Sequence, residues 1–224
     1  MGDRTSERLR DFYDAMHRAL GPQHWWPGET PLEVIVGAIL TQNTAWKNVE
    51  RAIENLRAAG CLNWKRLRDV APARLAELIR PAGYFNVKTQ RLKAFVEWFW
   101  NRYGGDLDRM FATPVHTLRD ELLSVRGIGR ETADSILLYA GEKPTFVVDA
   151  YTYRILRRHR LIDDDADYEQ IKDLFESNLP ADIAMYNEYH ALLVAVGKDH
   201  CRPRARCAGC PLERFPHDVE SPEG

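Results

Sequence analysis

The sequence lacks any long apolar run. Its longest strongly apolar stretch, residues 32–40, is about half as long as a membrane-spanning helix must be. The first twelve residues, MGDRTSERLRDF, are polar and contain no apolar segment of the kind found in a secretory signal. These two absences predict a cytoplasmic protein that does not span a membrane.

The chain also lacks an excess of charge of either sign. It has 31 Lys and Arg against 33 Asp and Glu, a formal net charge of −2 over 224 residues. This balance excludes a generically polycationic nucleic-acid coat, although it allows a local basic face. With 45% apolar and 29% charged residues, the composition is that of a folded globular protein.

Cysteine is scarce and unevenly placed. Of the four cysteines, Cys61 stands alone, whereas Cys201, Cys207 and Cys210 lie within ten residues of one another. A disulfide framework would be denser and more widely spread. The spacing therefore favours a reducing compartment and a metal or cluster site near residue 205.

Alternating strand patterns are nearly absent, and residues 145–148 form the one β-like run. Apolar residues instead recur at helical spacing, as in residues 88–103, and prolines fall between the periodic segments. Residues 32–40 are apolar on all sides, which predicts a helix buried all round. We expect an all-α fold with helices over 6–20, 32–40, 46–58, 64–70, 73–80, 88–103, 117–125, 131–140, 150–159, 167–178 and 181–197.

A Gly-x-Gly turn separates two apolar helical runs. It consists of Arg126, Gly127, Ile128, Gly129 and Arg130. Two glycines permit a tight turn with outward-facing amides, and these amides, with the start of the next helix, suit a DNA phosphate. A plain connector between two helices explains the same residues equally well. In either case the apolar side chain at position 128 would fill the gap between the helices.

Longer segments carry a family resemblance. LLSVRGIGRETADSILLYA followed by FVVDAYTYRIL resembles the helix-hairpin-helix and Gly-Pro-Asp region of the endonuclease III superfamily of DNA glycosylases, and AILTQNTAWKNVERAI matches its early helix and glutamine loop. WWPGETPLEVIVGAILTQNT and RPAGYFNVKTQRL look closer to the 3-methyladenine DNA glycosylase III branch. The resemblance spans residues 24–210.

The resemblance implies an architecture and a partner. It implies a two-lobed fold with a six-helix domain over residues 29–142, ending in the hairpin, and a second helical domain built from residues 1–28 and 143–224. Double-stranded DNA with a damaged base would lie in the cleft between the lobes of a monomer.

Asp149 follows an apolar run and precedes a predicted helix, so its position alone indicates an N-cap. The resemblance places it at the superfamily's catalytic position, and the two roles are compatible. Cleavage of an N-glycosidic bond builds positive charge on the sugar, which a fixed carboxylate stabilises while it orients or deprotonates water.

Bifunctional relatives carry a lysine just after the hairpin, which forms a Schiff base with the sugar. Here that position is Glu131, which cannot form an imine. We therefore expect base removal by water, without efficient AP-lyase activity. Without the resemblance, Glu131 is an ordinary acidic residue in the first turn of a helix.

A base inside a duplex must be flipped out before its glycosidic bond can be reached. The resemblance makes Gln42 the residue that fills the resulting gap, with Asn43 as a neighbouring duplex contact; otherwise both belong to a polar loop. Trp25, Trp26 and Trp46 are candidates for the base pocket, because indole faces attract a cationic alkylated purine. Core packing is the alternative for each tryptophan.

The cysteine loop resembles the family's C-terminal [4Fe–4S] loop, but LERFP stands where the fourth cysteine is expected. Three alternatives stay open: a cluster completed by His217 or another ligand, a Cys3His zinc site, and a loop without metal. Any such site would be structural. Two arginine-rich stretches, residues 154–160 and 202–206, are candidates for phosphate contacts.

The sequence thus predicts a monofunctional DNA glycosylase of base excision repair that removes an alkylated purine such as 3-methyladenine. The alternatives are an endonuclease III-related or adenine-mismatch glycosylase, and a non-catalytic hairpin protein that binds DNA.

Overall fold

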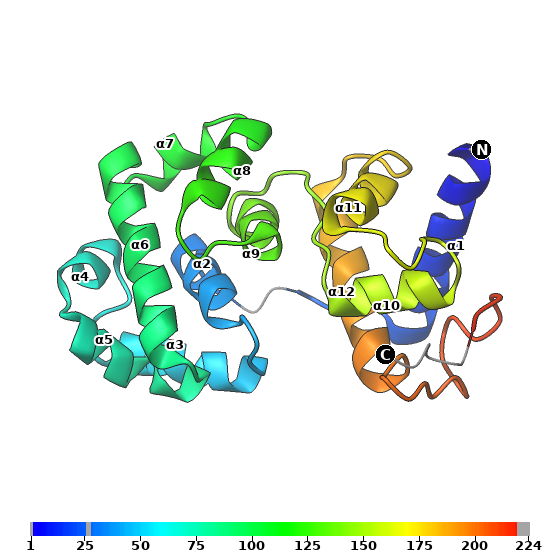
Figure 1. Ribbon diagram of the computed structural model, residues 1–224, viewed down its shortest axis with the longest axis horizontal. Helices are drawn as coiled ribbons and strands as arrows, with labels where there is room; N and C mark the ends of the chain where they lie inside the picture. Colours follow the sequence, from blue (N-terminus) through cyan, green and yellow to red (C-terminus); the bar gives the residue numbers. More distant parts are fainter. Residues whose placement is uncertain (1, 26–27, 219–224) are drawn as a thin grey trace. The chain divides into compact units, whose positions relative to one another are not determined.

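The computed structural model describes residues 2–25 and 28–218, and every regular element within those ranges is a helix (Figure 1). The predicted all-α fold is confirmed. No helix in these ranges is both long and apolar enough to cross a membrane. The elements are α1 (Gly2–Leu20), α2 (Pro31–Leu40), α3 (Trp46–Ala58), α4 (Trp64–Asp69), α5 (Pro72–Leu78), η1 (Arg80–Ala82), α6 (Phe85–Tyr103), α7 (Leu107–Phe111), α8 (Val115–Ser124), α9 (Arg130–Ser135), η2 (Ile136–Ala140), α10 (Ala150–Arg158), α11 (Tyr168–Glu176) and α12 (Ile183–Asp199).

The chain forms two compact units. One comprises Trp26–Lys143, and the other comprises Met1–Trp25 with Pro144–Gly224. The first therefore contains α2 to η2, and the second contains α1 and α10 to α12.

Helix α2 is the central element of the 26–143 unit. Thr30 caps its first turn by accepting a hydrogen bond from the Glu33 amide, and Pro31 supplies a preset φ at the first helical position. Every residue from Glu33 to Leu40 is buried, as expected for a helix that is apolar on all sides. It contacts α3, α6, α9 and η2, so the hairpin is built directly on this core.

In the other unit, α12 contacts both α1 and α10. The buried Tyr189 hydroxyl of α12 donates to the Leu9 carbonyl of α1 over 2.8 Å. The β-like run predicted at residues 145–148 is buried but belongs to no strand. Its Phe146 amide donates instead to the Glu176 carboxylate over 2.7 Å. This buried segment leads straight into Asp149 and α10.

Further local features differ from the sequence expectation. The structure contains helix α7, which the sequence did not predict because five residues are too few to show a helical repeat. The expected helix over residues 131–140 changes to a π-helical turn, η2, in its second half.

Candidate active site

Asp149 is the N-cap of α10. Its Oδ1 accepts hydrogen bonds from the Thr152 amide at 2.8 Å and from the Thr152 hydroxyl at 2.9 Å. Its side chain is only 11% exposed. The carboxylate is therefore held in one orientation at the start of a helix.

The second carboxylate oxygen faces His190 of α12. The His190 Nε2 lies 3.6 Å from Asp149 Oδ2, longer than a hydrogen bond but within ion-pairing range of a protonated imidazole. Burial by itself raises the pKa of Asp149, but His190 and the two bonds from Thr152 outweigh it, so the pKa lies below its ordinary value. Asp149 is therefore an anion at neutral pH.

Trp25 lies beside this pair. Its ring meets the His190 ring edge-on, with centroids 6.3 Å apart and an interplanar angle of 81°. The Lys198 Nζ lies 5.7 Å from the centroid of the indole. Trp25 is thus the predicted pocket residue that the structure brings to the surroundings of Asp149.

The other two predicted pocket tryptophans, Trp46 and Trp26, stay predictions. Trp46 belongs to the 26–143 unit, where it begins α3 and its Nε1 donates to Glu50 over 2.8 Å. Trp26 lies outside the described residues.

The hairpin connects α8 to α9. Gly127 takes a left-handed φ of +89°, whereas Gly129 is extended and forms the N-cap of α9. Ile128 is buried in the core cluster of its unit, while Arg126 and Arg130 are exposed. Only the first of the two glycines therefore uses the conformational freedom that the sequence suggested. Phosphate binding by these residues stays a prediction.

Gln42 and Asn43 follow α2 but differ in their surroundings. The Gln42 Nε2 donates to the Gly127 carbonyl at 3.1 Å and to the Thr132 hydroxyl at 2.8 Å. Its Oε1 accepts a hydrogen bond from Arg91 of α6. Asn43 is exposed and takes a left-handed φ of +53°.

Glu131 lies in the first turn of α9 and is exposed. An acidic side chain here suits the positive end of the helix dipole.

Comparison with known proteins decides the family. Residues 36–181 match the profile of the HhH-GPD superfamily of base excision DNA repair proteins, which is well over half of the chain. The chain belongs to the HhH-GPD superfamily. A protein of Methanocaldococcus jannaschii, named provisionally as a DNA repair glycosylase, is 48% identical over 217 residues, which are 96% of this chain and 98% of the relative.

Solved structures agree with this assignment. The 3-methyladenine DNA glycosylase of H. pylori, bound to 1,N6-ethenoadenine, has a TM-score of 0.71 and 28% identity, covering 87% of this chain and 97% of its own. A non-covalent endonuclease III–DNA complex has a TM-score of 0.80 with 94% of both chains covered, but at 20% identity it supports the fold alone. This HhH-GPD protein is a DNA glycosylase with the endonuclease III-like fold.

Two residues that lie against the predicted site residues carry no signal in the local sequence. His190, next to Asp149, lies in the middle of the largely buried α12, where nothing in the local sequence separates it from a core residue. Arg91, bonded to Gln42, lies in α6 among other charged residues. Both contacts join distant segments, so no local motif indicates them.

The arginines of residues 154–160 have partners inside their own unit. Arg158 is buried and donates to the Cys201 Sγ at 3.2 Å, the Arg202 carbonyl at 2.7 Å and the Pro203 carbonyl at 2.8 Å. Arg154 donates to the Cys201 carbonyl. Arg158 thus fixes the cysteine loop to α10. Because its side chain is buried, it does not fit the predicted contact with a phosphate. Pairing accounts for two further arginines, Arg157 with Asp164 and Arg160 with Asp218.

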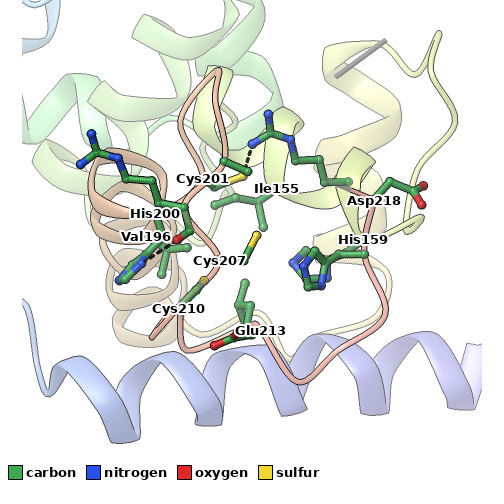
Figure 2. A pocket seen from close by; sticks show the side chains of 14 residues that line it. Ile155, His159, Val196, His200, Cys201, Cys207, Cys210, Glu213 and Asp218 are labelled. Atoms are coloured by element: carbon green, nitrogen blue, oxygen red, sulfur yellow. Dashed lines mark hydrogen bonds between the residues drawn. The ribbon is translucent and has the colours of Figure 1, made fainter. Parts of the chain in front are cut away.

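The three clustered cysteines line one pocket together with His159 (Figure 2). None of the three takes part in a disulfide. Burial, and then the neighbouring Cys201 and Cys207, raise the pKa of the Cys210 thiol. His217 also lines this pocket, and its Nδ1 lies 2.7 Å from the Phe215 carbonyl.

These residues do not fit a four-thiolate cluster. The fourth cysteine is missing, and the Arg158 guanidinium donates a hydrogen bond to the Cys201 sulfur. Among residues 2–25 and 28–218, no three Cys, His, Asp or Glu side chains are arranged to hold a metal ion.

Proposed function

We propose that this glycosylase is monofunctional and hydrolyses the N-glycosidic bond of an alkylated purine, such as 3-methyladenine, in double-stranded DNA. The observation that carries the proposal is the fixed, ionised Asp149, combined with Glu131 where a lysine would be needed for imine chemistry. Asp149 supplies charge stabilisation, and the chain offers no nucleophilic amine at the position after the hairpin.

The reaction then needs only this chain's residues and water. The bond between the base nitrogen and C1′ of the sugar breaks, and the electron pair leaves with the base. Positive charge that develops on the sugar is stabilised by the Asp149 carboxylate. Water adds its oxygen to C1′ and gives its proton to Asp149 or to bulk solvent, which leaves an abasic site on an intact strand.

An alkylated purine suits this arrangement for two reasons. N-alkylation makes the base cationic and hence a good leaving group, so that little acid catalysis is required. Trp25 offers an indole close to Asp149, and this ring already attracts one cation, the Lys198 ammonium. The relative from H. pylori, 28% identical and named for 3-methyladenine, supports the same substrate class.

We propose that Asn43 and Tyr84 contact the opened duplex. Tyr84 is 72% exposed and takes a left-handed φ of +44°, so an aromatic ring is held out into solvent where a base could stack. The buried Lys88 ammonium donates to the Leu40 and Ala82 carbonyls, both at 2.8 Å. It therefore joins the end of α2, which leads to Asn43, to the turn that carries Tyr84.

A panel of duplexes tests the substrate class. Each duplex carries one defined lesion: 3-methyladenine, 7-methylguanine, 1,N6-ethenoadenine, uracil or thymine opposite guanine, adenine opposite 8-oxoguanine, or thymine glycol. Abasic sites are scored after alkali, with Asp149→Asn as the inactive control. We expect excision of alkylated purines. Excision confined to mismatched or oxidised bases would overturn the substrate class, and DNA binding without any excision would favour a non-catalytic protein.

We also propose that the cysteine loop keeps its shape without a metal. Arg158 holds it at one sulfur and two carbonyls, and the Asp218 amide returns a hydrogen bond of 2.8 Å to the Arg158 carbonyl. These bonds tie both ends of the loop to α10 and do not require a ligand.

A further inference from the structure

His190 of α12 contacts two residues to which the proposed function gives different roles. Its Nε2 lies 3.6 Å from the Asp149 Oδ2, and its ring meets the Trp25 ring edge-on, with centroids 6.3 Å apart and an interplanar angle of 81°. All three residues belong to the unit formed by residues 1–25 and 144–224. One side chain therefore contacts both the carboxylate proposed to stabilise the sugar and the indole proposed to hold the base.

The contact with Asp149 involves the nitrogen of the ring. Thr152 donates both of its hydrogen bonds to Oδ1 of Asp149, so the other carboxylate oxygen is the one that faces His190. Because an ionised carboxylate oxygen can only accept, the Nε2 facing it carries a hydrogen whether the imidazole is neutral or protonated. Either form favours the anion of Asp149. The contact is long, but catalytic hydrogen bonds often shorten when substrate binds.

The charges around this pair make His190 the group that matters for Asp149. Burial raises the pKa of Asp149, and among the described residues His190 is the ionisable side chain that acts against this, with help from the uncharged Thr152. The neighbouring charged side chains act on the rings of Trp25, Tyr189 and Tyr186, and they are Lys198 of α12, Asp14 of α1 and Glu176 of α11, respectively.

The contact with Trp25 is of a different kind. An edge-on pair of rings depends on the shape and orientation of both rings, so it uses the flat ring of His190 and does not need its nitrogen. The His190 side chain is only 6% exposed, and α12 packs against both α1 and α10. The ring therefore has little freedom to turn, and it sets the place of the indole relative to the carboxylate.

We infer that His190 is a positioning residue with two separable functions: its Nε2 holds Asp149 as an oriented anion, and its ring sets the indole of Trp25 at a fixed place relative to that carboxylate. The inference deepens the proposed function and rests on it, because it takes Trp25 as the residue that holds the base while Asp149 acts on the sugar. Bond cleavage and lesion binding should then depend on different parts of one side chain.

Two substitutions separate these parts. His190→Phe keeps a flat ring for Trp25 and removes the nitrogen, whereas His190→Gln removes the ring and supplies an amide donor of similar reach. His159→Phe is the matched control, because His159 is a similarly buried histidine of the same unit, and its ring contacts Phe12 and the Pro216 carbonyl. Melting temperatures confirm that each variant is folded.

Single-turnover excision of the alkylated purine that the wild type removes fastest gives a maximal rate and a half-saturating enzyme concentration. At about pH 6, His190→Phe should lower the maximal rate about tenfold, which is the loss expected for a hydrogen bond to a charged group, with little change in half-saturation. The deficit should shrink at about pH 9, because the carboxyl group then ionises without help. His190→Gln should instead raise the half-saturating concentration about fivefold and keep most of the rate. His159→Phe should change neither quantity.

A second measurement does not depend on excision. The chemical shift of the Asp149 carboxyl carbon, assigned with Asp149→Asn, is followed by NMR against pH in the protein without DNA. His190→Phe should raise the midpoint of this titration, and His190→Gln should raise it less, because the amide still donates to the carboxylate.

Several results would overturn the inference. Equal losses of rate and affinity in both variants would make His190 an ordinary core residue, and faster excision by His190→Phe or an unmoved Asp149 titration would show that His190 does not favour the anion. If His190→Phe does not fold, His190→Gln decides: a loss of affinity alone supports the inference, and an equal loss of rate overturns it. A wild type that excises no alkylated purine, combined with the expected titration, would refute the proposed function alone. Active wild type without separable losses would refute the inference alone.

Discussion

Replacement of Asp149 by Asn separates its role as a helix cap from the catalytic role that we propose for it. The amide oxygen of Asn can accept the same bonds from the Thr152 amide and hydroxyl that Asp149 Oδ1 accepts at 2.8 and 2.9 Å. Asn and Asp are equally good N-caps, so the start of α10 should be preserved. What the substitution removes is the negative charge, together with its attraction to His190.

The size of the effect follows from that charge. A unit charge about 4 Å from the positive sugar, at an effective dielectric constant near 20, contributes about 4 kcal/mol. A loss of this size corresponds to about a thousandfold lower rate of bond cleavage. Removal of one preorganised electrostatic group in other enzymes costs about 10²- to 10³-fold, which agrees with this value.

Single-turnover excision with excess enzyme measures the rate directly, with abasic sites revealed by alkali. We expect the Asn variant to bind an abasic duplex within about threefold of wild type while its excision rate falls about a thousandfold. Asp149→Ala serves as the comparison, because it loses the charge and also about 1 kcal/mol of helix capping. An Asn variant that excises within about threefold of the wild-type rate would reduce Asp149 to a helix cap.

Three further outcomes are expected. The product should be an intact strand with an abasic site, and borohydride should trap little protein–DNA adduct, because Glu131 stands at the lysine position; efficient trapping would show that another amine, such as Lys198, forms the imine. Purified protein should contain iron and zinc well below stoichiometric amounts, and chelators should leave its Tm unchanged, whereas Arg158→Met should lower the Tm; a brown protein absorbing near 400 nm would refute this. Burial lowers the pKa of His159 from 6.5 to about 4. As the pH falls, the His159 imidazole is therefore protonated in the unfolded chain before it is protonated in the folded one. The free energy of unfolding should accordingly fall by up to about 3 kcal/mol between pH 6.5 and pH 4. Chemical denaturation at several pH values should show a flatter profile for His159→Gln, and an identical profile would refute the assignment.

Most of the fold could be predicted because its signals are local. An apolar run preceded by a threonine cap and a proline predicts the buried α2, and Asp149 predicts the start of α10. The hairpin is marked by its glycines. By contrast, α7 has five residues, and a π-helical turn such as η2 differs from an α-helix by hydrogen-bond register, which side-chain periodicity does not encode.

The candidate site could be predicted only in part, because its residue types are local but its contacts are not. Asp149 and Gln42 stood out by motif. Their partners His190 and Arg91 come from other helices, and each looks like an ordinary core or surface residue in its own segment. Sequence alone therefore indicates candidate groups for the site but not the residues that orient them.

The arginines of residues 154–160 show that a pattern of charge does not identify the partners of each side chain. Four arginines within seven residues resemble a phosphate-binding face in a protein whose net charge is only −2. In the folded unit, Arg154 and Arg158 instead donate to carbonyls and a sulfur of the cysteine loop, acceptors that lie more than forty residues further along the chain. A row of arginines in a sequence shows where hydrogen-bond donors lie, but it does not show which acceptors they bind in the folded protein. The arginine-rich stretch and the cysteine loop are separate patterns in the sequence, but in the structure they contact each other within one folded unit.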